Sequence, residues 1–514
     1  MDETLQHPSR FAVTAPDRLA VIMGESGETL TYGQLEDRSC RVGNLLRSRG
    51  VATGSHVAIL VENRKEFFEV LWGGMRTGMF VTPINWHLAP GEAAYIIRDC
   101  GASALFASAG VPRIDEIVAA TGDLLAVSVA IGGTIDGFDD YESALADQPN
   151  TRPADECEGN FMFYSSGTTG QPKGIKPQAT GGSIGLQTGF TMLVQFLYGG
   201  GEDTVYLSPA PLYHAAPAGW TTTMHRLGGT AVVMERFDPH KVLELIQTHR
   251  VTHVQFVPTH LIRLLKLPAA DRAQFDHSSL KYAIHAAAPC PIEVKQAALD
   301  WLGPVVYEYY SGSEGAGFCA IGPEEWIAHP GSVGKSMMGP VHIIGPDREE
   351  LPAGEEGEVW FEAPQPFEYH GDAEKTAEAH DDRGWSTIGD VGRVDADGYL
   401  YLTDRVSNMI ISGGVNIYPR EIEDILVVHP KVADAAVIGV PHADLGETVR
   451  AVVQVAPGIL ADEAFADELI EHCRERLSHF KCPTSVAFLD ELPRLPTGKL
   501  AKRMLPASVR SVDS

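Results

Sequence analysis

Segments with helical periodicity alternate with short strand-like runs through the first third of the chain, and this alternation limits the fold most strongly. Thr31 and Gln34 have the spacing of a capping box, which predicts the start of a helix. The segments that follow are typical, in turn, of strand, helix, strand, helix and strand, namely residues 57–61, 67–79, 80–84, 91–100 and 104–106. Such an alternation predicts a mostly parallel, doubly wound α/β sheet.

The same pattern returns between residues 238 and 265, so we predict two stacked doubly wound α/β subdomains. From about residue 341 short strands separated by turns replace it, which predicts a small β-barrel-like unit over about residues 331–403. A compact segment follows in which Pro419 is expected to begin a helix, and an apolar stripe from Phe465 to Phe480 is expected to be core. The fold class is therefore predicted as α/β (α+β overall), with a large N-terminal domain over 1–403 and a small mobile α+β C-terminal domain over 404–514.

The chain has 514 residues and a formal net charge of −28, which disfavours a nucleic-acid-binding protein or a protein of anionic membrane surfaces. Its seven cysteines form no C-x-x-C pair, as is typical of a reducing compartment. The N-terminus lacks the apolar core of a signal peptide, and we find no apolar run near the roughly 18 residues that span a bilayer. These features predict a cytoplasmic protein without integral membrane association.

A loop rich in glycine and hydroxyl residues follows the apolar run 161–164, which we expect to be a short buried strand. Glycines let backbone N–H groups approach an anion, and one lysine adds a positive charge. The loop is not a Walker A motif, because Lys173 is followed by Gly174 rather than by serine or threonine. We therefore expect a phosphate site of another nucleotide-using class, with these loop residues as contacts: Ser165, Ser166, Gly167, Thr168, Thr169, Gly170 and Lys173.

This loop resembles the signature loop of the adenylate-forming superfamily, which includes acyl-CoA synthetases. Further segments resemble that family in the same order along nearly the whole chain. They are Ala286-Ala287-Ala288-Pro289, Tyr309-Tyr310-Ser311-Gly312-Ser313-Glu314, residues 385–390 ending in Asp390, Asp404-Arg405, Ser412-Gly413-Gly414 and residues 495–499 ending in Lys499.

The resemblance implies a role for each segment that would bind ATP. Ala287, Ala288 and Pro289 would border adenine and the acyl group, and the alanines that replace the family's usual glycines either narrow the acyl pocket or are neutral. The segment Tyr309 to Gly312 would lie at the nucleotide, with Tyr310 packed on adenine. Ser313 would contact the α-phosphate, and Glu314 would hold Mg²⁺, with Thr168 as a further candidate ligand.

Other implied roles concern the ribose, the hinge, CoA and the acid. Asp390 would bind the ribose hydroxyls and Arg405 would reach the nucleotide. Asp404 would be the hinge between the domains, and Ser412, Gly413 and Gly414 would line the path of the CoA arm. Lys499 would bridge the carboxylate and the α-phosphate during adenylation, and His214 would stand near the acyl carboxylate or be a buried structural histidine.

The implied reaction has two steps. A carboxylic acid would react with MgATP to give an acyl-adenylate and pyrophosphate, and the thiol of CoA would then displace AMP. No Asp or Glu occurs between residues 209 and 233, where members that adenylate amino acids place an Asp, so we expect an apolar acid that is fatty, aryl or alicyclic. Three alternatives stay open, namely transfer to a carrier-protein pantetheine, a non-catalytic acyl- or nucleotide-binding relative and an oxygen-using luciferase. We expect a monomer or homodimer.

Overall fold

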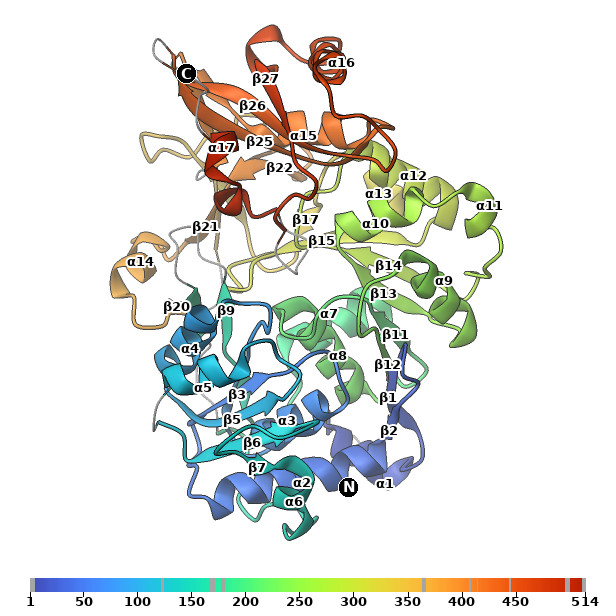
Figure 1. Ribbon diagram of the computed structural model, residues 1–514, viewed down its shortest axis with the longest axis vertical. Helices are drawn as coiled ribbons and strands as arrows, with labels where there is room; N and C mark the ends of the chain where they lie inside the picture. Colours follow the sequence, from blue (N-terminus) through green and yellow to red (C-terminus); the bar gives the residue numbers. More distant parts are fainter. Residues whose placement is uncertain are drawn as a thin grey trace. The chain divides into compact units, whose positions relative to one another are not determined.

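The computed structural model describes residues 5–121, 124–165, 172–176, 181–362, 367–405, 408–413, 415–442, 445–494 and 500–510; of Ser165 and Asn416 only the backbone is described. The chain divides into two compact units (Figure 1). Unit 1 comprises Met1–Phe256, Leu267–Ile284 and Phe367–Ala377, and unit 2 comprises Val257–Lys266, His285–Pro366 and Glu378–Ser514.

The first sheet of unit 1 is entirely parallel, as the alternating pattern predicts. Its strands lie in the order β7 (Asp139–Asp140), β6 (Val127–Ile131), β5 (Ala102–Ser108), β3 (His56–Leu60), β4 (Phe80–Pro83) and β8 (Asn160–Phe161). The helices α4 (Pro90–Asp99) and α5 (Ile114–Thr121) lie on one side of it, and α2 (Tyr32–Ser48) and α6 (Tyr141–Ala146) on the other (Figure 1). The predicted capping box begins α2, because Thr31 Oγ1 accepts from Gln34 N at 3.2 Å and Gln34 Oε1 accepts from Thr31 N at 2.9 Å.

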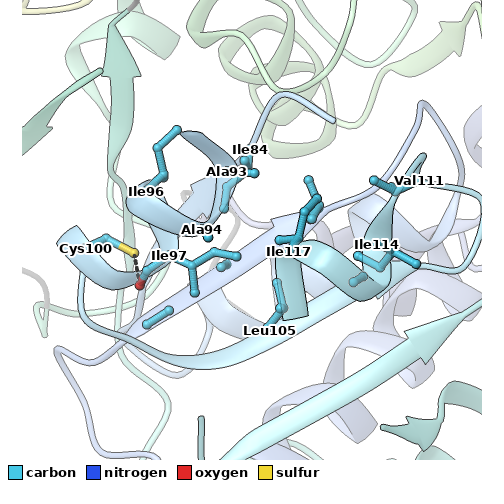
Figure 2. Packing of buried hydrophobic residues seen from close by; sticks show 14 of the residues in the cluster. Ile84, Ala93, Ala94, Ile96, Ile97, Cys100, Leu105, Val111, Ile114 and Ile117 are labelled. Atoms are coloured by element: carbon cyan, nitrogen blue, oxygen red, sulfur yellow. Dashed lines mark hydrogen bonds between the residues drawn. The ribbon is translucent and has the colours of Figure 1, made fainter. Parts of the chain in front are cut away.

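The apolar core under α4 and α5 explains why these helices sit on the sheet. Figure 2 shows Ile96 and Ile97 of α4, Ile117 of α5 and Leu105 of β5 as members of one cluster of buried residues between these helices and the sheet. Leu105 and Ile97 are fully buried, and Ile96 and Ile117 are nearly so. Burying each of these side chains contributes roughly 1.5–3 kcal/mol relative to leaving it in water.

The strands that unit 1 contributes to a second sheet are also mostly parallel, with only the edge pair β1–β2 antiparallel among their described pairs. These strands follow the order β14 (Tyr282–His285), β13 (His253–Phe256), β11 (Val205–Ser208), β12 (Thr230–Val233), β1 (Leu19–Met23) and β2 (Thr29–Thr31). A third, three-stranded sheet has the order β20 (Glu368–Tyr369), β10 (Lys173–Lys176) and β9 (Phe163–Ser165). The remaining helices of the unit are α1 (Pro8–Thr14), α3 (Glu66–Met75), α7 (Gly189–Tyr198), α8 (Ala215–Leu227), α9 (Pro239–Thr248), α11 (Ala269–Arg272) and α14 (Ala373–Glu378, whose last residue belongs to unit 2).

Unit 2 contains the predicted β-rich segment as a four-stranded antiparallel sheet. Its strands are β18 (Val341–Ile344), β19 (Gly357–Phe361), β21 (Ser386–Val394) and β22 (Leu400–Arg405). The antiparallel strands β15 (Val306–Ser311), β16 (Phe318–Ile321) and β17 (Lys335–Ser336) lie beside one another. A five-stranded sheet toward the C-terminus comprises β24 (Val415–Ile417), β23 (Ile410–Ser412), β26 (Gly446–Val455), β25 (Val432–His442) and β27 (Ser485–Phe488).

The helices of unit 2 are α10 (Pro258–Leu265), α12 (Ile292–Leu302), α13 (Pro323–Ala328), α15 (Pro419–Val427), α16 (Glu463–Arg474) and α17 (Ala507–Arg510), with 3-10 turns at His479–Lys481 and Lys502–Met504. Pro419 begins α15 as predicted. Within the described ranges, every helix is too short or too polar to cross a bilayer.

Three sequence predictions are wrong in detail. The run 161–164 is not one buried strand, because β8 and β9 belong to different sheets. Phe161 and Phe163 are only half-buried, and their rings stack with centres 4.7 Å apart. The helix expected over 67–79 ends at Met75, because Gly78 has a positive φ of 68° that continues no helix. The stripe expected to reach Phe480 stops with α16 at Arg474, and Phe480 is 54% exposed.

His225 of α8 is fully buried, and its two ring nitrogens have fixed roles. Trp72 Nε1 donates to His225 Nδ1 at 3.1 Å, and His225 Nε2 donates to the carbonyl of Ala20 at 3.1 Å. Protonating Nδ1 would break the bond from Trp72. Burial lowers the pKa of His225 from 6.5 to about 4, although the bond to Ala20 acts in the opposite direction.

We expect His225 to make the protein less stable in acid. Between pH 6.5 and 4 the unfolded chain binds this proton and the native state does not, so stability is fully present above pH 6.5 and falls as pH decreases. Because of His225, the free energy of unfolding should fall by about 2 kcal/mol as the pH decreases from 6.5 to 5. Urea unfolding at pH 7, 6 and 5 measures the free energy of unfolding of the wild-type protein and of His225→Leu. The variant should be less stable than the wild type at pH 7 but should lose less stability on acidification. Equal losses in both proteins would contradict the prediction.

Candidate functional site

A buried carboxylate joins three strands of unit 2 at one point. Asp390 of β21, 7% exposed, accepts a hydrogen bond from the hydroxyl of Tyr310 at 2.5 Å and one from Arg405 Nε at 2.9 Å. Asp390 and Arg405 are directly opposite each other in the antiparallel pair β21–β22, so strand register fixes the ion pair. Each Asp390 oxygen uses one of its two acceptor positions in these bonds, so the carboxylate can still accept hydrogen bonds from a diol.

Tyr310 is held as a donor in this cluster. Burial raises the pKa of Tyr310 well above its usual value, and the neighbouring Asp390 raises it further. The phenol is therefore protonated at neutral pH. Its strand neighbour Tyr309 is buried and stacks on Phe318 with ring centres 5.2 Å apart.

Glu314 lies in the turn that follows β15, next to the Asp390 cluster. A methyl group placed on Gly312 would come within 2.8 Å of both Glu314 Oε2 and Ile388 Cδ1, so a larger residue there would have to displace these two side-chain ends. The charge of Glu314 acts on Arg405, which links this carboxylate to the same cluster. Ser313 is exposed, whereas the hydroxyl of Ser311 donates to the carbonyl of Gly317 at 2.7 Å. Tyr310, Glu314, Asp390 and Arg405 are thus brought together.

The segment Ala286 to Pro289 contains a strained residue. Ala287 has a φ of 73°, a left-handed conformation that costs an alanine about 1–2 kcal/mol. Its side chain is exposed, Ala288 is half-buried and Pro289 is exposed. Directly before it stands the fully buried His285, whose Nε2 is 3.5 Å from Glu308 Oε2, so the segment begins beside β15.

A buried ion pair lies next to His285 and the segment Ala286 to Pro289 that follows it. Lys295 of α12, 1% exposed, donates to Glu308 Oε2 of β15 at 2.6 Å. The Lys295 ammonium also lies 4.8 Å from the ring centre of Trp326. Burial lowers the pKa of His285 to about 4, so Lys295 is the cation that balances Glu308 at neutral pH.

In unit 1 the Gly-rich loop connects β9 to β10, and the strands pair with Lys173 opposite Ser165. Lys173 Nζ donates to Asp372 Oδ2 at 2.8 Å, and Lys173 is half-buried. His214, also in unit 1, is half-buried directly before α8 and packs against the ring of Tyr213 at 4.4 Å. Trp220 of α8 is fully buried and meets Phe190 edge-on at 5.7 Å.

The predicted CoA and hinge residues lie in unit 2. Gly413 has a φ of 57°, and its N–H donates to the carbonyl of Leu445 at 2.9 Å. Ser412 pairs with Gly446 of β26. The carboxylate of Asp404 accepts from the backbone N of Arg405 at 2.7 Å, from Asn408 Nδ2 at 2.9 Å and from the backbone N of Arg420 at 3.2 Å.

Several predicted site residues lie outside the described residues, namely Ser166, Gly167, Thr168, Thr169, Gly170, Gly414 and Lys499. Their roles stay predictions. The described part of the chain holds no group of three or more His, Cys, Asp or Glu side chains arranged to hold a metal ion.

The sequence did not predict Asp372 or the pair Lys295–Glu308 as part of the site. Asp372 stands before α14 and its side chain accepts from Lys375 N at 3.0 Å, so its sequence position predicts a helix cap but not a partner for Lys173. Lys295 and Glu308 had a usable signal, since each interrupts an otherwise apolar face of its helix or strand.

The comparisons with known proteins assign the family. The model of the AMP-binding enzyme matches residues 9–369, and that of the AMP-binding enzyme C-terminal domain matches residues 421–499. The chain therefore belongs to the AMP-binding enzymes, which confirms the predicted membership of the adenylate-forming superfamily.

Relatives match nearly the full length. A feruloyl-CoA synthase of Amycolatopsis is 36% identical over 96% of this chain and 96% of its own length. A long-chain-fatty-acid–CoA ligase of Mycobacterium tuberculosis is 31% identical over 96% of each chain. The crystal structure of an anthranilate CoA ligase in complex with anthranoyl-AMP superposes with a TM-score of 0.83 at 26% identity, covering 98% of this chain and 96% of that one. The predicted α/β fold is thus confirmed.

Proposed function

We propose that the chain is an AMP-forming carboxylic acid–CoA ligase. The observation that carries the proposal is the cluster of Tyr310, Asp390 and Arg405, with Glu314 beside it, in a chain that CoA ligases match over nearly its whole length. The acid would attack the α-phosphorus of ATP and release pyrophosphate, and the CoA thiol would then displace AMP from the acyl-adenylate.

Asp390 would bind the ribose hydroxyls through its remaining acceptor positions, and Arg405 would balance its charge. Tyr310 would pack against adenine, with Ala287, Ala288 and Pro289 at the border between adenine and acyl group. Lys499 would stabilise the charge that develops on the α-phosphate. Ser165 to Gly170 would hold the phosphates, and Ser313 would contact the α-phosphate.

Mg²⁺ fits the donor set at Glu314. The ion is usually held by one or two carboxylates together with substrate phosphates and water. Glu314 offers such a carboxylate beside the cluster, with Thr168 as a further candidate, and the described residues hold no larger cage of ligands. When bound, the ion would neutralise phosphate charge.

The C-terminal domain over residues 404–514 would move about Asp404 between the two steps, so that Lys499 serves adenylation and the segment Ser412 to Gly414 serves thioester formation. An apolar acid is the proposed substrate, because α8 and its flanks carry no carboxylate between residues 209 and 233 to pair with an α-amine. The relatives named for ferulate and for long-chain fatty acids agree with an aryl or fatty acid.

Release of pyrophosphate across a panel of aryl, alicyclic and fatty acids, with and without CoA, tests the proposal. We expect acid-dependent pyrophosphate release and a CoA-dependent thioester with at least one apolar acid. Lys499→Met should lose adenylation. The matched control is Lys502→Met: the ammonium of Lys502 lies 2.8 Å from Glu423 in the wild-type protein, and its removal should leave adenylation intact. No thioester from any acid, or equal losses in the two lysine variants, would contradict the assignment.

A further inference from the structure

Lys173, the lysine of the Gly-rich loop, is already paired. Its ammonium donates to Asp372 Oδ2 at 2.8 Å, with side-chain exposures of 18% and 34%. The bond from Lys173 is the largest cause that lowers the pKa of Asp372, so this carboxyl is ionised at neutral pH. This ion pair uses one of the three N–H donors of the Lys173 ammonium and offsets its charge.

Asp372 is itself fixed in place by its neighbours. Its Oδ1 accepts from the backbone N of Lys375 at 3.0 Å, and its carbonyl accepts from Thr376 Oγ1 at 2.8 Å. Thr376 Oγ1 in turn accepts from the backbone N of Tyr369 in β20 at 3.0 Å. The carboxylate is therefore aimed at Lys173 by the first turn of α14 and by β20.

A second set of bonds holds the same hairpin from α4. Tyr164 of β9 donates its hydroxyl to Asp99 Oδ2 at 2.6 Å, and Tyr95 donates to Asp99 Oδ1 at 3.1 Å. His370 joins the two sets, because its backbone N donates to the carbonyl of Gly174 at 2.8 Å and its Nε2 donates to the carbonyl of Asp99 at 2.9 Å. Both strands that flank the Gly-rich loop are thus bonded to fixed carboxylates.

The packing around Gly174 shows how tightly the base of the hairpin is built. A methyl group on Gly174 would lie 2.5 Å from Met162 Cε and 3.1 Å from both His370 Cβ and Tyr164 Cζ. Beside the ion pair, by contrast, lies a cavity of about 380 Å³ that is lined by Tyr95, Asp99, Pro172, Lys173, His370, Gly371 and Asp372. Without Asp372 the long Lys173 side chain would have room to leave its present position.

We propose that Asp372 is a positioning residue for ATP: it holds Lys173 at the point where the Gly-rich loop rejoins the sheet, and so fixes the loop for the phosphates. The proposal rests on the proposed function, since it assigns the loop to ATP. It changes the role predicted for Lys173, which becomes an anchor of the loop rather than a phosphate contact. A loop rich in glycine presents its N–H groups in one arrangement only if its ends are held, because glycine has the largest conformational freedom to lose.

Steady-state pyrophosphate release, measured against ATP at saturating acid and against acid at saturating ATP, tests the proposal with Asp372→Asn, Lys173→Met and the double variant. Each single change is expected to raise the KM for ATP about tenfold, and the double change should be no worse than either single one, because both remove the same bond. The KM for the acid should change less than about twofold. Asp372→Glu, which keeps the charge, should restore part of the affinity for ATP.

The exposed pair Lys241–Glu244, at 2.8 Å on α9, is a matched control, and Lys241→Met should leave both KM values unchanged. If Lys173 contacts phosphate directly, Lys173→Met raises the KM for ATP while Asp372→Asn, which frees the ammonium, leaves or lowers it; that result overturns the proposal. If the wild-type enzyme is active and both single variants keep its KM values, the positioning role of Asp372 is overturned as well. A wild-type protein without acid-dependent pyrophosphate release would instead refute the proposed function itself.

Discussion

Replacing Asp390 with asparagine is expected to raise the KM for ATP about 10- to 100-fold, because hydrogen bonds to a charged group contribute about 1.5–3 kcal/mol. Asp390 is 7% exposed and has two fixed donors, the hydroxyl of Tyr310 at 2.5 Å and Arg405 Nε at 2.9 Å. The amide keeps the shape of the side chain but loses the charge that balances Arg405, and one of its two acceptor oxygens becomes a donor. Pyrophosphate release as a function of ATP concentration measures the effect.

Asp395→Asn is the matched control for this prediction. Asp395 follows the same strand and also accepts from a tyrosine hydroxyl, that of Tyr401 at 3.1 Å, together with the backbone N of Tyr399 at 2.9 Å. Asp395→Asn should therefore disturb a turn of the sheet while leaving the KM for ATP within about twofold. Equal effects of the two variants would mean that Asp390 acts through the stability of the sheet and not through the nucleotide.

Local patterns were sufficient to predict the parallel sheet around β3, β4 and β5. Each of these strands is a short apolar run followed by a helix, so nearest-neighbour signals determine it. The order of strands was not predictable, because β1 pairs with β12, more than 200 residues later, and no local signal states that pairing. The break between Phe161 and Phe163 escaped prediction for a similar reason, since the two strands differ in partners and not in composition.

The candidate site divides in the same way. Asp390, Glu314 and Arg405 could be named from motifs, but their mutual contacts come from strand register and from the close packing at Gly312. Asp372 could not be named, because Lys173 stands 199 residues before it and the pairing of β10 with β20 is what brings the two together. Charges that face each other across sheets need tertiary structure to be recognised.

Replacing Lys295 with methionine is expected to lower the free energy of unfolding of the region that contains it by about 3–5 kcal/mol, because removing one partner of a buried ion pair leaves an uncompensated charge. Lys295 is 1% exposed and donates to Glu308 at 2.6 Å, while Glu308 is 6% exposed. His285, 3.5 Å from Glu308, cannot replace the lysine near neutral pH, because burial lowers the pKa of His285 to about 4. Methionine has a similar length and can pack its sulfur near the Trp326 ring that the ammonium now faces, so the loss reports the charge rather than a cavity.

The double variant Lys295→Met/Glu308→Met separates the ion pair from packing. Replacing both charges by apolar side chains of similar volume is often neutral or stabilising, so the double variant should recover most of the stability that Lys295→Met loses. Lys431→Met is the exposed control: Lys431 contacts Glu468 at 2.7 Å with both side chains more than 40% exposed, and its loss should cost at most about 1 kcal/mol. Guanidinium unfolding of the four proteins at pH 7.5 measures the differences. A Lys295→Met protein as stable as Lys431→Met, or a double variant no more stable than Lys295→Met, would show that Glu308 is not held charged by Lys295.

Because Glu308 and Tyr310 lie on the same face of β15, two residues apart, a loosened Lys295–Glu308 pair should also displace the phenol from Asp390, so the KM for ATP of Lys295→Met should rise together with its instability.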